Sequence, residues 1–223
     1  MKLIFPPLDD LIDVSNESYV NFVVIENQRL FVNVLTDILN QINGDRGKAV
    51  LSDNHSVLDM AKKLEMISSF VPFDINRRAL LGKLLKRIEA AMNDEENHIK
   101  TKEMIAYNIS YLNDILEGFD FNLDFSSDFD LSYILKAADI KFSNSFNLLS
   151  EMLIEYMKNV IMLEGDKCFV LINAADYMSV DELELFCRDI VLNKLSAVVI
   201  GARDINVCEY QKKIIIDADL CVI

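Results

Sequence analysis

Residues 19–25 read YVNFVVI and lead directly into a pattern typical of an amphipathic helix over residues 28–41. The first stretch is rich in β-branched and aromatic side chains, which favour a buried strand. In the second stretch the apolar residues fall near one helical face, and Glu26-Asn27 can cap its start. A short strand predicted over residues 48–51 would complete a β-α-β unit, the usual element of a parallel sheet. This stretch therefore predicts an α/β fold.

A long helical stretch separates the opening of the chain from a second α/β region. Its two helices are predicted over residues 76–92, where leucines form one stripe, and over residues 99–116. We therefore expect an α/β head with an inserted helical leg, divided as residues 1–72, 73–140 and 141–223. Further helices are predicted over residues 57–63, 144–162 and 179–192, and strands over residues 64–70, 167–172, 197–200, 213–216 and 220–223.

The composition suits one large folded domain, or a domain with an insertion. Hydrophobic residues make up 52% of the 223 residues, enough for a real core. The sequence has no apolar run long enough to span a membrane and no secretion leader, so we expect a cytoplasmic protein without a membrane partner. The cysteines form no C-x-x-C pair and are expected to be buried free thiols. They are Cys168, Cys187, Cys208 and Cys221.

Residues 44–49, GDRGKA, partly match a phosphate-binding loop. Two residues separate the glycines instead of four, Ala49 replaces the hydroxyl that binds magnesium, and the segment leads into a strand instead of a helix. Asn173 lies just after a predicted core strand, where a nucleotide-hydrolysing fold would place a metal-binding acid, and an amide binds magnesium poorly. The sheet can therefore resemble a P-loop NTPase core, but the sequence lacks its catalytic motifs.

Between Glu103 and Leu135 the chain has no Lys or Arg, and acidic residues alternate there with phenylalanines. Asp120 and Asp124 occupy the spacing of the first EF-hand ligands, although Phe125 takes the position of the required glycine. Such oxygen-rich spacing suits calcium better than a transition metal. A solvated acidic loop with aromatic anchors is the alternative.

The first long helix carries basic side chains on one face. Lys83, Lys86 and Arg87 fall opposite the leucine stripe, whereas the whole chain has a net charge of −14. This face either keeps the helix soluble or contacts the phosphates of a nucleic-acid duplex. Further basic residues that could extend it are Lys62, Lys63, Lys100 and Lys102.

Several short motifs, in their order and spacing along nearly the whole chain, resemble one protein family, the Csn-type accessory proteins of type II-A CRISPR loci. The motifs are MKLIF with Leu8-Asp9, Val24-Ile25-Glu26, FDIN at residues 73–76, FVLIN at residues 169–173 with Asp181-Glu182, Val199-Ile200 with Arg203-Asp204, and Asp217-Ala218-Asp219.

The resemblance implies a head like a degenerate P-loop NTPase core and a helical leg. It also implies a non-catalytic homotetrameric ring, supported by calcium, that binds ends of double-stranded DNA without sequence specificity during spacer acquisition. The best matches to the family's calcium-binding acids are Glu117, Asp120 and Asp124. Implied partners are other adaptation proteins, including the integrase and the RNA-guided nuclease. Two alternatives remain open: a metal-dependent nuclease that uses these acids, and a protein scaffold that does not bind DNA.

Overall fold

The computed structural model describes residues 1–126, 128, 130–204 and 209–223. The chain divides into two compact units. The head unit consists of Met1–Ile75 and Asn144–Ile223, and the leg unit consists of Asn76–Ser143. The sequence placed the leg at residues 73–140. Each unit is described by itself below.

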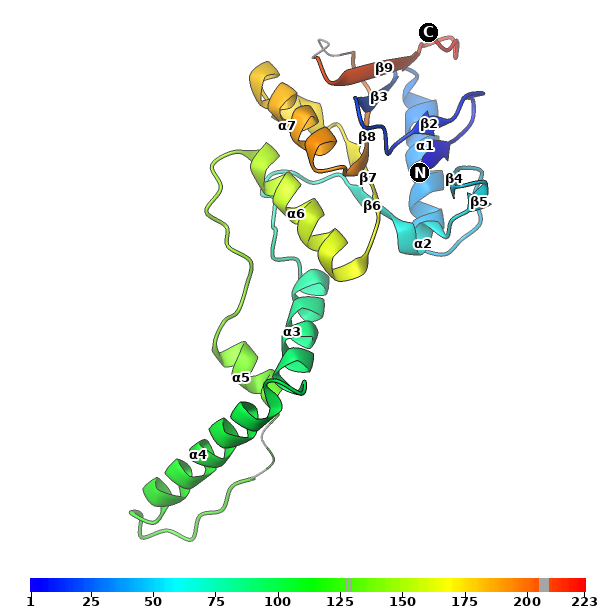
Figure 1. Ribbon diagram of the computed structural model, residues 1–223. Coiled ribbons are helices and arrows are strands. Elements are labelled where there is room, and N and C mark those ends of the chain that lie inside the picture. The colour runs from blue at the N-terminus through cyan, green and yellow to red at the C-terminus, as the bar shows by residue number, and fades with distance from the viewer. Residues whose placement is uncertain (127, 129, 205–208) are drawn as a thin grey trace. The chain divides into compact units, whose positions relative to one another are not determined.

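A five-stranded parallel sheet forms the centre of the head unit, with the strand order β6-β7-β8-β3-β9 (Figure 1). All four pairings are parallel, and Val23 of β3 lies opposite Ile200 of β8 and Ile214 of β9. The three central strands are almost fully buried, as their continuous apolar runs predict. The strands are β3 (Val20–Ile25), β6 (Leu64–Ile67), β7 (Cys168–Ile172), β8 (Ser196–Gly201) and β9 (Gln211–Ile216).

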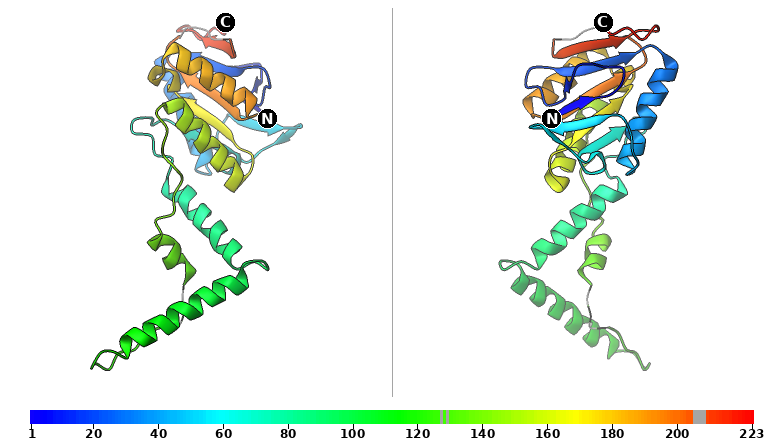
Figure 2. Two further views of the ribbon diagram at one scale, coloured as in Figure 1. Left: turned by 60° about the vertical axis from the view of Figure 1, so that its left-hand side comes forward. Right: turned by 90° about the vertical axis from the view of Figure 1, so that its right-hand side faces the viewer.

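Helices cover both faces of this sheet, so the head unit has the layered α/β architecture predicted from the sequence (Figures 1 and 2). On one face, Val34 and Ile38 of α1 (Gln28–Ile42) belong to the main apolar core. On the other face lie α6 (Leu149–Glu164) and α7 (Val180–Leu192), which pack against each other. The predicted cap of α1 is present, since Asn27 accepts a hydrogen bond from the N–H of Leu30. Ser179 caps α7 in the same way by accepting a hydrogen bond from the N–H of Glu182.

The head unit also contains a second, antiparallel sheet, which the sequence did not predict. Its strand order is β2-β1-β4-β5, and the strand expected at residues 48–51 is its β4 (Val50–Asp53). The prediction of a parallel β-α-β opening is therefore wrong. β4 pairs instead with β1 at the start of the chain, where Leu3 lies opposite Leu51. Both side chains are fully buried in the main core. The other strands are β1 (Lys2–Ile4), β2 (Ile12–Asp13) and β5 (Ser56–Val57).

Two short helical segments and a terminal turn complete the head unit. They are α2 (Met60–Lys63) and the 3-10 helix η1 (Ala174–Tyr177). Residues 220–223 form a turn back onto β9, in which Ile223 and Ile215 exchange two backbone hydrogen bonds. Cys168 and Cys187 are buried free thiols as expected, but Cys221 is exposed, because it lies in this turn. Cys208 lies outside the described residues.

The leg unit contains α3 (Arg78–Met92), α4 (His98–Leu116) and a short helix, α5 (Leu131–Ala137), which the sequence did not predict. α3 packs against α5. Few of the described side chains in the helices of the leg unit are buried. They are Leu80 of α3, Thr101 of α4, and Leu131 and Leu135 of α5. In the described parts of both units, no helix is long and apolar enough to cross a membrane.

Candidate nucleic-acid interface

The crevice where a parallel sheet usually binds its ligand is nearly closed. After β3 the chain continues in this sheet with β6 at one edge, and after β8 it continues with β9 at the other edge. In a parallel sheet, a ligand crevice lies at the carboxyl ends of two neighbouring strands whose connections run in opposite directions. The cavity at this point is lined by Val24, Asn173, Gly201 and Arg203, among others, and has a volume of about 10 Å³. That is about the space one water requires. Asn173 occupies this edge, and its side chain accepts a hydrogen bond from the N–H of Ala202 at 3.2 Å.

The segment GDRGKA does not lie at this edge of the sheet. Only Glu26 and Asn27 separate β3 from α1, too short a link to wrap a phosphate, and GDRGKA follows the other end of α1. There the carboxylate of Asp37 accepts hydrogen bonds from the N–H groups of Lys48, at 2.9 Å, and Ala49, at 2.8 Å. A phosphate loop would direct such N–H groups at its ligand. The segment is therefore a turn held by Asp37 and not a phosphate-binding loop.

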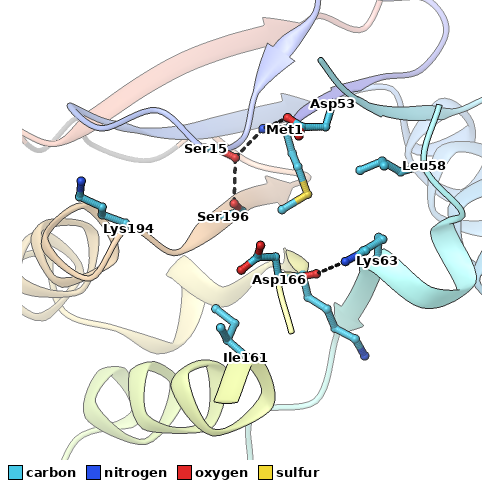
Figure 3. A pocket seen from close by; sticks show the side chains of 10 residues that line it. Met1, Ser15, Asp53, Leu58, Lys63, Ile161, Asp166, Lys194 and Ser196 are labelled. Atoms are coloured by element: carbon cyan, nitrogen blue, oxygen red, sulfur yellow. Dashed lines mark hydrogen bonds and ion pairs between the residues drawn. The ribbon is translucent and has the colours of Figure 1, made fainter. Parts of the chain in front are cut away.

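A larger polar pocket of about 360 Å³ lies at the opposite end of β7 and β8 (Figure 3). Lys63 lines this pocket and donates a hydrogen bond to the backbone oxygen of Asp166 at 3.3 Å. The hydroxyls of Ser15 and Ser196 meet across it at 2.8 Å. Since Asp53, Asp166 and three lysines line the pocket, both signs of charge are present and neither a cation nor an anion is clearly favoured.

The predicted basic residues fall into two groups. Lys62 and Lys63 belong to α2 of the head unit, where Lys62 forms an ion pair with Asp59 at 3.3 Å. The others belong to the leg unit. Lys83, Lys86 and Arg87 are exposed on α3, whereas Leu80 is buried and Leu81, Leu84 and Leu85 of the same helix are half-buried. The structure thus brings together the three residues of α3, which we call the basic face.

Lys100 and Lys102 are exposed in the first turns of α4. They flank the buried Thr101, whose hydroxyl donates a hydrogen bond to the backbone oxygen of Met92 at 2.7 Å. That bond ties the start of α4 to the end of α3 and holds both lysines close to the helix junction. A nucleic-acid duplex presents phosphates along its whole length. A duplex that contacts the basic face has further phosphates for Lys100 and Lys102.

The three predicted calcium ligands are exposed and lie around the end of α4. Glu117 directly follows the helix, and one carboxylate oxygen of Asp124 already accepts a hydrogen bond from the N–H of Phe125 at 2.8 Å. No group of three His, Cys, Asp or Glu side chains that could hold a metal occurs among the described residues. Within that part of a single chain, Glu117, Asp120 and Asp124 are therefore not brought together as one group.

Another acid of this stretch has a structural role that the sequence reading missed. Asp130 caps α5 by accepting a hydrogen bond from the backbone N–H of Ser132 at 2.8 Å. The pKa of Asp130 is lowered, first by the side-chain hydrogen bond of Ser132 and then by this backbone bond. The pattern Asp-x-Ser before an apolar run was the signal that could have revealed this cap.

The sequence reading also missed an uncovered apolar surface on α4. Tyr107, Tyr111 and Ile115 recur every fourth residue and are exposed, on a different side of the helix from the half-buried Ile105 and Ile109. The signal in the sequence for this surface was the helical spacing of Tyr107, Tyr111 and Ile115, which form a second apolar series on the same helix.

Comparison with known proteins gives concordant matches. The family model described as CRISPR-associated protein (Cas_Csn2) matches residues 41–220. The CRISPR-associated protein Csn2 of Enterococcus faecalis is 22% identical over 204 residues, which are 91% of this chain and 90% of that protein. The crystal structure of Stu0660 of Streptococcus thermophilus superposes with a TM-score of 0.52 at 13% identity, covering 96% of this chain and 74% of that one, and supports the fold.

Proposed function

The chain belongs to the Cas_Csn2 family of CRISPR-associated proteins, and from that premise we propose that it binds ends of double-stranded DNA during spacer acquisition. In this proposal the protein works in the cytoplasm, in CRISPR-based defence, by binding and without catalysis. It acts as a homotetrameric ring, together with the integrase and the RNA-guided nuclease. The ring and these partners rest on the family resemblance.

The basic face of α3 is the observation that carries the proposal. Lys83, Lys86 and Arg87 project from one helical face of a chain whose net charge is −14. Three cations bind a duplex weakly, because the affinity grows with the number of phosphates that are neutralised. Several copies around one hole would add their cations in a single field. Assembly therefore supplies what one chain lacks.

The state of the sheet edge favours binding over turnover of a nucleotide. Asn173 and its neighbours leave about 10 Å³ in the crevice, and Asp37 engages the N–H groups that a phosphate loop would use. The nuclease alternative needs Glu117, Asp120 and Asp124 to converge on a metal ion. The described residues show no such convergence.

Calcium remains in the proposal on the resemblance alone. Glu117, Asp120 and Asp124 carry the right atom type, since calcium takes carboxylate oxygens. No step of DNA binding is assigned to the ion.

A comparison of linear and closed circular duplex DNA tests the proposal. A ring that binds ends retards linear duplex in a gel, but leaves closed circles of the same sequence free. We expect retardation of linear DNA to weaken steeply as salt rises, because counterions are released on binding. Equal retardation of both forms would contradict end binding. No retardation of either form at low salt, with calcium present, would favour the scaffold alternative.

A further inference from the structure

Helix α4 meets the end of α3 at a corner of the leg unit, formed by residues 93–97 (Figure 2). The structure describes every residue of α4, and Thr101 is the only one of them that is buried. The apolar side chains of α4 that are less exposed, such as Ile105 and Ile109, are half-buried. Packing along the helix therefore constrains the direction of α4 little, and the corner has to set it.

Two side chains of α4 bond to α3 across this corner. The hydroxyl of Thr101 donates to the backbone oxygen of Met92 at 2.7 Å, and the side-chain amide of Asn97 donates to that of Ala91 at 3.0 Å. Both acceptors are among the last four carbonyls of α3, which an α-helix leaves without donors of its own. These bonds therefore join the end of one helix to the start of the next. We call Asn97 and Thr101 the corner pair.

Asn97 does not have the role that its position usually gives. It is the N-cap residue of α4, where an Asn side chain ordinarily accepts a hydrogen bond from an N–H of the first turn. In α4, which is described throughout, that bond is absent. The side chain reaches back to α3 instead, and the N–H of Asn97 donates to the carboxylate of Asp94 in the corner at 2.9 Å. Asn97 thus links two helices and does not cap one.

A small rotation at the corner displaces the far end of α4 by a large distance. At about 1.5 Å per residue, the 19 residues of α4 span about 28 Å. A rotation of about 10° at the corner moves the far end by about 5 Å, close to the pitch of one helical turn. Any contact that another chain makes near that end therefore depends on the corner.

The proposed ring makes this dependence important, and the inference rests on that part of the proposed function. Copies of one chain close into a ring only if every chain presents its contacts at the same rotation, and another rotation gives open or mixed assemblies. Tyr107, Tyr111 and Ile115 of α4 are 72%, 55% and 46% exposed, so α4 offers apolar side chains that assembly can cover. A fixed direction of α4 is then a condition for closure.

We propose that Asn97 and Thr101 are positioning residues for the ring. By bonding the last carbonyls of α3, they set the direction of α4 and so the rotation at which neighbouring chains meet. Thr101 is 7% exposed and bonds within its own chain, so it acts through the direction of the helix and contacts neither DNA nor the neighbouring chain.

Matched double variants test the proposal in native mass spectrometry with calcium present. Asn97→Ala with Thr101→Val removes the two bonds across the corner. Asn93→Ala with Asn108→Ala also removes two side-chain bonds of the leg unit, to Glu89 and Met104, but each lies at or within a single helix. We expect the first variant to lose the tetramer in favour of smaller and mixed species, and the control to keep it. Equal losses in the two variants, or an intact tetramer in the first, overturn the proposal.

A conservative change and a folding measurement separate positioning from stability. Thr101→Ser keeps the hydroxyl and should keep the tetramer, whereas Thr101→Val alone should lose part of it. Circular dichroism should show equal helix content in the corner variant and its control. A greater loss of helix in the corner variant overturns the proposal, because the bonds would then support the folding of α4 and not its direction.

The direction of α4 can also be measured within one chain. Spin labels at Gly82→Cys on α3 and Asn113→Cys on α4 report the distance between the helices, in a chain with Cys208→Ser and Cys221→Ser that is diluted with unlabelled protein. We expect one narrow distance distribution, which Asn97→Ala with Thr101→Val broadens and the control does not. Equal widths overturn the proposal. A wild type that is not a tetramer contradicts the proposed function, whereas the distance distributions still decide whether the corner pair sets the direction of α4.

Discussion

The side-chain oxygen of Asn173 accepts a hydrogen bond from the backbone N–H of Ala202 at 3.2 Å, and so ties the turn after β7 to the end of β8. Asn173 has φ 56°, in the left-handed region that Asn adopts more readily than most residues. Its own N–H donates to the oxygen of Ile200 at 2.8 Å. Both bonds join the turn after β7 to the carboxyl end of β8 at this edge of the sheet.

Two substitutions of Asn173 should separate the contribution of its side-chain hydrogen bond from that of its left-handed backbone conformation. Asn173→Ala loses the hydrogen bond and strains the left-handed backbone, so we expect the free energy of unfolding to fall by about 1–3 kcal/mol. Asn173→Gly loses only the hydrogen bond and should cost about 0.5–1.5 kcal/mol. Urea unfolding monitored by circular dichroism measures both. Wild-type stability in the alanine variant would show that this edge is held by other contacts.

The buried thiol of Cys168 predicts a loss of stability at alkaline pH. Burial raises the pKa of Cys168 from 9.0 to about 12, because a thiolate would lose its hydration. Above pH 9 the unfolded chain releases this proton while the folded chain keeps it. The unfolded state is then favoured, and stability falls as the pH rises toward 12.

Unfolding curves between pH 8 and 10.5 measure the contribution of this thiol. Cys168→Ala should flatten the decline by up to about 1.4 kcal/mol per pH unit, although it lowers stability at neutral pH by leaving a small cavity. Cys221→Ser is the control, because Cys221 is exposed in the native protein and should leave the slope unchanged. An identical slope in wild type and Cys168→Ala would contradict the prediction.

The parts of the fold that the sequence predicts well are those with local causes. β3 and β7 are buried on both faces, so their continuous apolar runs identify them. Asn27 and Ser179 fix the start of their helices through bonds to residues three positions away. The pairing of Leu3 with Leu51 depends on residues far apart in the chain, and no local pattern indicates whether β4 joins the parallel sheet or a separate one.

The same distinction applies to the candidate sites. Lys83, Lys86 and Arg87 share a face because helical periodicity alone places them there. Convergence of Glu117, Asp120 and Asp124 would depend on how the chain turns after α4, which spacing does not determine. Asp120 and Asp124 match an EF-hand only in sequence, since Phe125 lacks the freedom of the glycine that the calcium loop needs for its sharp turn.

Calcium should raise the melting temperature if the family resemblance extends to its metal. A ligand that binds only the folded state at a hundred times its Kd adds about 2.7 kcal/mol, or about 5–10 °C for a chain of this size. Asp120→Asn with Asp124→Asn should abolish the shift, and Asp181→Asn with Glu184→Gln on α7 should retain it. Magnesium at equal ionic strength controls for general screening of the acidic chain. A melting temperature that calcium leaves unchanged would remove the metal from the proposal.

Neutralising the basic face should weaken binding of linear duplex DNA and reduce its salt dependence. The change is Lys83→Gln, Lys86→Gln and Arg87→Gln in one variant. If each cation neutralises one phosphate, the slope of log K against log salt should become shallower by about 3 for each bound chain. Filter binding across a series of salt concentrations measures the slope, and circular dichroism checks that the variant is folded.

A matched triple variant in the head unit separates a specific interface from the effect of net charge. Lys158→Gln, Arg188→Gln and Lys194→Gln removes the same number of charges from exposed positions on and just after α6 and α7. If α3 contacts DNA, this control keeps both affinity and slope, because its cations neutralise no phosphate. Equal losses in the two triples would mean that DNA responds only to the total charge, and an unchanged slope in the α3 triple would place the interface elsewhere.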